Sequence, residues 1–224
     1  MQLMLGPHPM VLAMPNMPPA LRAGLEVLGR ATGHFLIVTH RYEMFRALAR
    51  DAAFVARINE TTASDGLNTI RGALAATLVI SLAALFDRNS DPTSLARVLN
   101  SALAPANADT FAAFHLAFAI PIDIGQAREG LRRLHSRLSR EPLKGAIERL
   151  RDLRNQDVAH LDLNPDFPKG RALTRDIDMV HAISANIIVK VNRFCGVNVR
   201  TSGIHAEARA QAYALCRAIQ PSNL

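Results

Sequence analysis

Apolar residues between Leu143 and Leu161 recur every three or four positions, which is the spacing of an amphipathic helix. On a helical wheel that turns about 100° per residue, these apolar positions all lie within about 60° of Leu143. The stripe comprises Leu143, Ile147, Leu150, Val158 and Leu161. We therefore predict a long helix near Pro142–Asp162 that directs this stripe at a core or at a partner.

Two charged residues interrupt that stripe. Arg154 and Asp157 fall within it, at positions where a leucine would be expected. A buried charge without a partner is strongly destabilising. Either Arg154 pairs with Asp157 one turn further on, or this end of the stripe lines a polar site or an interface.

The same periodicity, with capping residues and prolines as boundaries, predicts helices along most of the chain, and no period-two strand pattern stands out. The fold class is therefore all-α, a helical bundle. Besides the helix near Pro142–Asp162, the expected helices are Pro19–Arg30, His40–Glu60, Asp65–Arg88, Pro92–Ala104, Asp109–Ala119, Pro121–Ser139, Thr174–Cys195 and Ile204–Ile219.

The chain divides into two expected parts. The first 19 residues hold five Met and five Pro, which favours an irregular arm, so we assign residues 1–39 to an N-terminal arm with a short helix. Residues 40–220 form the expected helical domain. The start of the chain lacks a basic n-region and does not resemble a signal peptide.

The most apolar run, Gly72 to Phe86, is 15 residues long, whereas a membrane span needs about 20, so we predict a buried core helix. Cys195 and Cys216 are too few and too isolated for a disulfide framework or a metal site, which favours a cytoplasmic protein.

Composition adds a candidate partner. The net charge is +7 and the isoelectric point is near 10.4, values that suit a polyanion such as RNA. Much of the surplus lies in nine basic residues that lead up to the interrupted stripe: Arg128, Arg132, Arg133, Arg137, Arg140, Lys144, Arg149, Arg151 and Arg154. The alternative is that these side chains only solvate helix surfaces.

The segment Leu153-Arg154-Asn155-Gln156-Asp157-Val158-Ala159-His160-Leu161-Asp162 resembles the motif of HEPN domains, in which a polar residue follows an Arg and a His comes four to six positions after it. The ending Ala-His-Leu-Asp is similar to the abortive-infection AbiU-type branch. A second stretch, Ile80–Asp87 running into Ser94-Leu95-Ala96, is similar to an upstream helix and loop of that branch.

The resemblance implies an endoribonuclease that needs no metal and acts in phage defence or a toxin–antitoxin system. Arg154 would bind the scissile phosphate, His160 would act as general acid or base, and Asn155 would orient the phosphate or the His. Asp157 would support Arg154. Arg151, Arg149 and Lys144 are further candidates for RNA contact.

On a single straight helix, Arg154 and His160 are about 120° apart, so the motif residues do not converge on one point. The resemblance implies that two protomers pack their motif helices together into one cleft. We therefore expect a homodimer, or a distortion near Leu161.

Several alternatives stay open. Arg154 and Asp157 could form an ordinary intrahelical ion pair, with His160 favouring the helix C-terminus as a cation. The chain could also be a non-catalytic module that binds RNA or protein, or a helical scaffold without a nucleic-acid role.

Other candidate chemistry is weaker. His181 lies on an apolar face with Ile177, Val180, Ile188 and Val191, so we predict a core residue. No metal-ligand spacing or glycine-rich phosphate loop occurs, and we expect neither a metal nor another cofactor. Asp162 stands where related toxins carry a modifiable Tyr, which argues against that form of control by an antitoxin.

Overall fold

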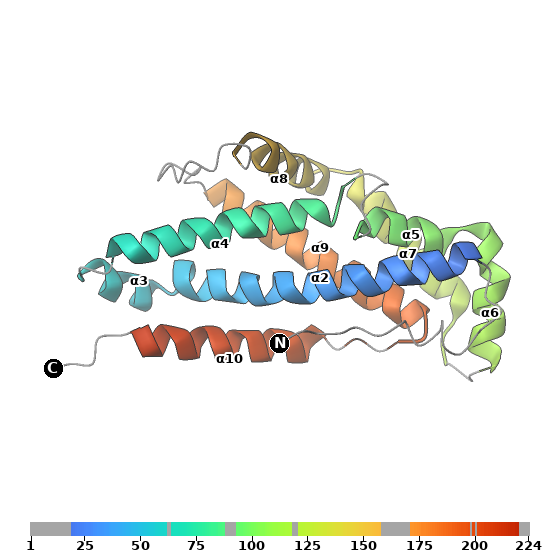
Figure 1. Cartoon of the computed structure of the whole chain (residues 1–224). Helices are drawn as coiled ribbons and strands as arrows, with labels where there is room; N and C mark the ends of the chain where they lie inside the picture. The colour runs from blue at the N-terminus through green and yellow to red at the C-terminus, as the bar shows by residue number, and fades with distance from the viewer. Residues whose placement is uncertain are drawn as a thin grey trace.

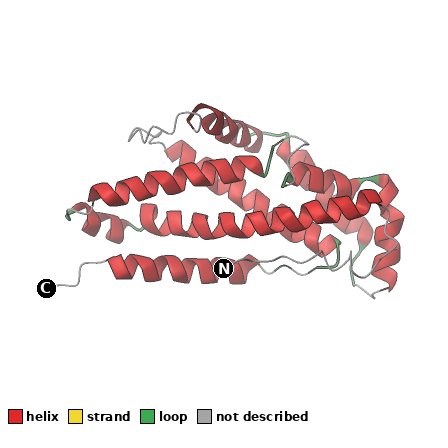
Figure 2. Ribbon diagram, in the orientation of Figure 1, coloured by secondary structure: helices red, strands yellow, loops and turns green. Residues whose placement is uncertain are grey.

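The computed structural model describes residues 19–61, 64–87, 93–117, 121–157, 171–197, 199 and 201–219, and within these ranges the regular structure is entirely helical (Figures 1 and 2). The all-α prediction is therefore confirmed. The elements are α2 (Pro19–Arg50), α3 (Ala52–Asn59), α4 (Ser64–Ala84), α5 (Leu95–Leu103), the 3-10 helix η1 (Pro105–Asn107), α6 (Ala108–Ala117), α7 (Ile124–Leu138), α8 (Leu143–Asp157), α9 (Arg171–Phe194) and α10 (Thr201–Ile219).

The N-terminal region departs from the sequence prediction. The two expected helices, Pro19–Arg30 and His40–Glu60, are wrong in their boundaries, because α2 runs without a break for 32 residues. It crosses the expected division between residues 39 and 40, and Phe35 and Tyr42 on either side of that division belong to one core. The expected irregular arm before Pro19 lies outside the described residues.

The polar residues between the two expected helices are paired with neighbouring helices. His34 donates from Nε2 to the Ser81 carbonyl on α4 at 3.0 Å. Thr32 accepts from the Asn192 amide of α9 at 3.1 Å. Thr39, which is fully buried, forms a hydrogen bond with His181 of α9. Because buried polar groups are tolerated when they are paired, α2 can continue through these positions.

The break instead falls at Asp51, within the expected helix His40–Glu60. The Asp51 carboxylate accepts a hydrogen bond from the Phe54 amide at 2.9 Å and so caps the start of α3. Ser94 likewise caps α5, which begins at Leu95 rather than at the expected Pro92. The other expected helices are present, and the ends that lie within the described residues are shifted by about four residues or fewer; the expected end of the helix near Pro142–Asp162 lies outside them.

One core joins α2, α4, α5, α6, α7, α8 and α9. Its largest fully buried side chains include Phe35 of α2, Leu78 and Leu82 of α4, and Phe194 of α9. Figure 1 shows α2 along the length of the bundle, with α4 and α8 on one side and α10 on the other. The motif helix α8 therefore packs against α4 and α9 at the edge of the core.

Of the described helices, α4 alone is long and apolar enough to meet the length and composition of a membrane span. Leu78 and Leu82 of this helix are fully buried against its neighbours. This packing is that of a core helix, as predicted for the apolar run Gly72 to Phe86.

Ion pairs and hydrogen bonds connect helix α10 to α2. Glu43, with 2% of its side chain exposed, accepts from His205 Nδ1 at 2.9 Å and from Arg209 Nε at 3.2 Å. Burial by itself raises the pKa of Glu43, but the hydrogen bonds from Arg209 and His205 outweigh it and leave that pKa below its usual value. The carboxylate therefore stays ionised beneath α10.

His181 is a core residue, as predicted. It is 3% exposed, its ring stacks on Tyr42 at 3.9 Å between centroids, and its Nε2 lies 3.3 Å from Thr39 Oγ1. Burial lowers the pKa of His181 from 6.5 to about 3. The folded protein therefore holds this imidazole neutral.

A prediction follows for acid stability. Below pH 6.5 His181 becomes protonated in the unfolded chain but stays neutral in the folded protein, because its folded-state pKa is about 3. The free energy of unfolding should therefore fall as the pH is lowered from 6.5 to about 3. The loss should be on the order of a few kcal/mol. Urea unfolding across this range should show a shallower pH dependence for His181→Gln.

The matched control is His135→Gln, because His135 is exposed on α7. This variant should keep the wild-type pH dependence. Equal pH slopes for wild type and His181→Gln would refute the assignment of acid sensitivity to His181.

Candidate functional site

The helix α8 places the motif at the edge of the core. Leu143, Ile147 and Leu150 are each at most 5% exposed, so the predicted apolar stripe faces inward in this part of the helix. Val158 and Leu161, which would continue it, lie outside the described residues. The described part of α8 extends to Asp157, and Figure 1 shows this helix above α4; it contacts both α4 and α9.

Arg154 reaches from this helix to the end of α4. Its Nη1 donates to the Asp87 carboxylate, and its Nε and Nη2 donate to Asn155 Oδ1 at 3.2 and 3.1 Å. The side chains of Arg154 and Asp87 are 24% and 26% exposed. The guanidinium that interrupts the apolar stripe therefore has a carboxylate partner in the segment that follows α4.

Asp87 is itself held in place by the start of α5. The Ser94 hydroxyl donates to the Asp87 carbonyl at 2.8 Å, and the Leu95 amide donates to the Leu85 carbonyl at 2.8 Å. Ser94 is fully buried. Because its backbone is tied on the α5 side, Asp87 provides a fixed point against which Arg154 is oriented.

Arg151 converges on the same place. Its Nη2 donates to the Phe86 carbonyl, and its Nε lies 4.0 Å from Asp87 Oδ1. Two guanidinium groups thus surround one carboxylate at the α4–α8 junction. These three side chains together keep a net positive charge that could attract an anion.

The other two candidates for RNA contact have different neighbours. Arg149 donates from Nε and Nη2 to the two oxygens of Asp176 on α9, at 2.7 and 2.8 Å. Asp176 is buried, so this bidentate pair fastens α8 to α9. Lys144 lies 3.8 Å from Glu148 on the exposed surface of α8.

The structure thus brings Arg154, Asn155 and Arg151 together and adds Asp87, which the sequence reasoning had not assigned to the site. Asp87 ends the second stretch that resembles the AbiU-type branch, so that stretch held the available signal. His160 and the side chain of Asp157 lie outside the described residues, and their roles stay predictions.

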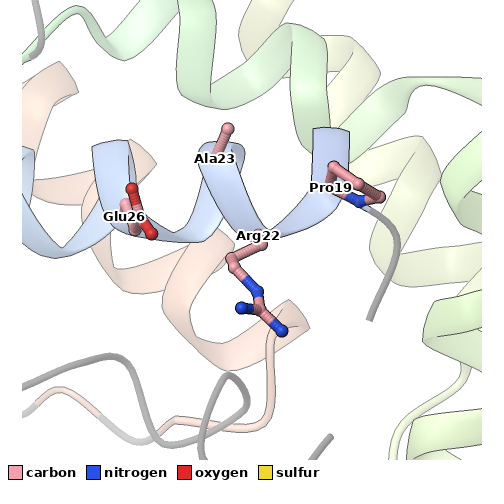
Figure 3. A pocket seen from close by; sticks show the side chains of 4 residues that line it. All are labelled: Pro19, Arg22, Ala23 and Glu26. Carbon is pink, nitrogen blue, oxygen red and sulfur yellow. The ribbon is translucent and has the colours of Figure 1, made fainter. Parts of the chain in front are cut away.

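Two surface hollows lie away from α8 and are not lined by residues of the motif. One of about 320 Å³ lies at the start of α2, where Arg22 and Glu26 stand one turn apart beside Pro19 (Figure 3). Another, of about 340 Å³, lies between the start of α7 and the end of α9. Among the described residues, no three His, Cys, Asp or Glu side chains are grouped as metal ligands would be.

Comparison with known proteins gives one family. The model of the HEPN_AbiU2 family, described as AbiU2, matches residues 21–187. This range begins in α2 and ends within α9, so it contains α4, α8 and the Arg154–Asp87 junction. Neither a curated protein nor a solved structure matches the chain.

The contact between Arg154 and Asp87 at the α4–α8 junction predicts an effect on stability. Asp87→Ala removes the carboxylate shared by Arg154 and Arg151, and should lower the free energy of unfolding by about 1–3 kcal/mol. Chemical denaturation of Asp87→Ala, Arg154→Ala and the double variant should give a coupling energy of about 0.5 kcal/mol or more.

Asp152→Ala is the matched control, because this carboxylate is exposed on α8. It should change stability by no more than about 0.5 kcal/mol. Additive effects of Asp87→Ala and Arg154→Ala would argue that the two side chains do not interact in solution.

Proposed function

The chain belongs to the AbiU2 family of HEPN domains, which gives it an abortive-infection context, and from this membership we propose that it is a metal-independent endoribonuclease. The observation that carries the proposal is the position of Arg154. Its guanidinium is fixed by Asp87 and Asn155 within a cluster of net positive charge, six residues before His160.

The proposed reaction needs only proton transfer and charge stabilisation. The ribose 2′-oxygen loses its proton and attacks the adjacent phosphorus, and the bond to the 5′-oxygen breaks as that oxygen takes up a proton. His160 serves as the general acid or base. Arg154 stabilises the charge that develops on the phosphorane oxygens.

The neighbours of Arg154 take supporting roles in this proposal. Asn155 Oδ1 accepts from Nε and Nη2 and so fixes the plane in which Arg154 meets a phosphate. Asp157 supports Arg154 rather than acting on the substrate. Arg151, Arg149 and Lys144 extend the contact with RNA along α8.

The proposed assembly is a homodimer in the cytoplasm. Arg154 and His160 point about 120° apart on a straight helix, so motif helices from two protomers would complete one cleft. An antitoxin or operon partner would hold the enzyme inactive until phage infection.

A non-catalytic HEPN module that binds RNA or protein is the second candidate. It is favoured by the contacts of Arg154, since Asp87 and Asn155 already accept hydrogen bonds from this guanidinium. A phosphate would have to share or replace these acceptors. In this alternative the junction is a structural tie and the basic surface is used for binding alone.

Cleavage in the presence of EDTA separates the two candidates. Wild-type protein should cleave a mixed RNA pool and leave 2′,3′-cyclic phosphate ends, whereas His160→Ala should lose this activity because proton transfer is lost. Activity is measured by gel electrophoresis and by mass spectrometry of the ends, with folding checked by circular dichroism.

His40→Ala is the control, because His40 lies on α2 and outside the α4–α8 junction. It should cleave as the wild type does. Nuclease activity retained in a clean His160→Ala preparation would refute the assigned role of His160, and RNA binding without cleavage by any variant would favour the binding module.

A further inference from the structure

We propose that the exposed arginines at the end of α7 form a surface that binds the RNA phosphate backbone and positions the strand along α8. We call Arg133, Arg137 and Arg140 the α7 basic row. This inference rests on the proposed function for the choice of RNA as ligand, but it concerns binding and can be tested without cleavage.

The three arginines follow one another at the C-terminal end of α7. Arg133 and Arg137 are one turn apart on α7, and the Arg140 amide donates to the Arg137 carbonyl at 3.2 Å just beyond the helix end. On a helical wheel Arg133 and Arg137 are about 40° apart, and Arg140 follows beyond the end of α7 at Leu138. All three residues are exposed, so the row presents three positive charges to solvent at the end of α7.

The positive charges of the α7 basic row are only partly neutralised by carboxylates. No carboxylate in the described part of the chain pairs with Arg137 or Arg140, whereas Arg133 lies 3.2 Å from Glu129. That pair is exposed, at 77% for Arg133 and 47% for Glu129, so it contributes little to stability and can give way to a phosphate.

The remaining arginines of α7 show that the row is a distinct set. Arg128 donates to the carbonyls of Leu103 and Ala104 at the end of α5, so its side chain is used in packing. Arg132 lies 3.6 Å from Glu129 and outside the row, about 100° around the helix from Arg133. Positive charge therefore increases toward the α8 end of α7.

This end leads directly into the motif helix. The Lys144 amide donates to the Arg140 carbonyl at 3.0 Å, which joins the row to the first turn of α8. From Lys144 to Arg154 the helix advances about 15 Å along its axis. A single RNA strand held on the row could thus extend along α8 to the α4–α8 junction.

The chemistry of the row favours a phosphate backbone. Guanidinium groups bind phosphate oxygens through paired, charge-assisted hydrogen bonds. Helix α7 carries no Phe, Tyr or Trp on which bases could stack, so recognition would depend on charge and little on sequence. Binding through charge alone should be steeply dependent on salt concentration.

The test measures binding of a short fluorescein-labelled single-stranded RNA of mixed sequence by anisotropy, over a series of KCl concentrations. All proteins carry His160→Ala, so that the probe is not cut. The row variant combines Arg133→Gln, Arg137→Gln and Arg140→Gln. A second variant places Lys at the same three positions and keeps the charge.

A charge-matched control removes three exposed arginines from other helices: Arg30→Gln on α2, Arg57→Gln on α3 and Arg217→Gln on α10. This control lowers the net charge as much as the row variant does. Any effect specific to the row variant therefore reports local contact rather than total charge.

We expect the row variant to bind about 10- to 100-fold more weakly near 0.1 M salt, with a slope of log K against log salt that is shallower by about 2. The Lys variant and the control should stay close to the parent protein. Equal affinities and slopes for the row variant and the control would overturn the proposal, as would failure of the parent protein to bind RNA.

This result is independent of the proposed catalysis. If wild-type protein does not cleave RNA, the nuclease proposal fails while the anisotropy measurement still decides the role of the row. If wild-type protein cleaves RNA but the row variant and the control bind equally, only the inference about α7 fails.

Discussion

The bundle depends on the burial of one continuous helix, α2. Its 32 residues span about 48 Å, and α4, α5, α9 and α10 pack against it along this length. A helix contacted from several sides buries polar as well as apolar side chains. Thr39 and Glu43 are buried in this way, and each has a hydrogen-bond partner on α9 or α10. The arrangement of the outer helices is thus tied to the polar groups of the central one.

These partners explain how much of the fold the sequence could predict. Helices with a clear apolar stripe were predicted well, such as α9 at both ends and α8 at its start, because periodicity is a local signal. The continuity of α2 was not predicted. The helix includes His34 and Thr39, polar side chains whose hydrogen-bond partners lie on α4 and α9. Those partners lie 47 and 142 positions away in the sequence. Local reasoning cannot supply contacts at such separations.

The same limit applies to the candidate site. The wheel identified Arg154 as a charge in an apolar stripe and required a partner or a polar site, and the structure provides Asp87, 67 positions earlier. Asp157 was the nearer acid and the natural choice from spacing alone. Asp87 could be noticed only as part of a second family-like stretch, because nothing local connects the end of α4 to α8. The sequence thus predicted the need for a counter-charge but not its source.

The pairing of α2 with the last two helices also bears on the order of events during synthesis. Helix α2 leaves the ribosome before α9 and α10, and the partners of Thr32, Thr39 and Glu43 lie 142 to 166 residues later. The nascent chain therefore carries these polar groups, and the apolar surface around them, without their native neighbours until nearly all of the domain has emerged. Such a late completion of the core delays its folding until α10 has been synthesised and leaves apolar surface of the incomplete chain exposed to aggregation.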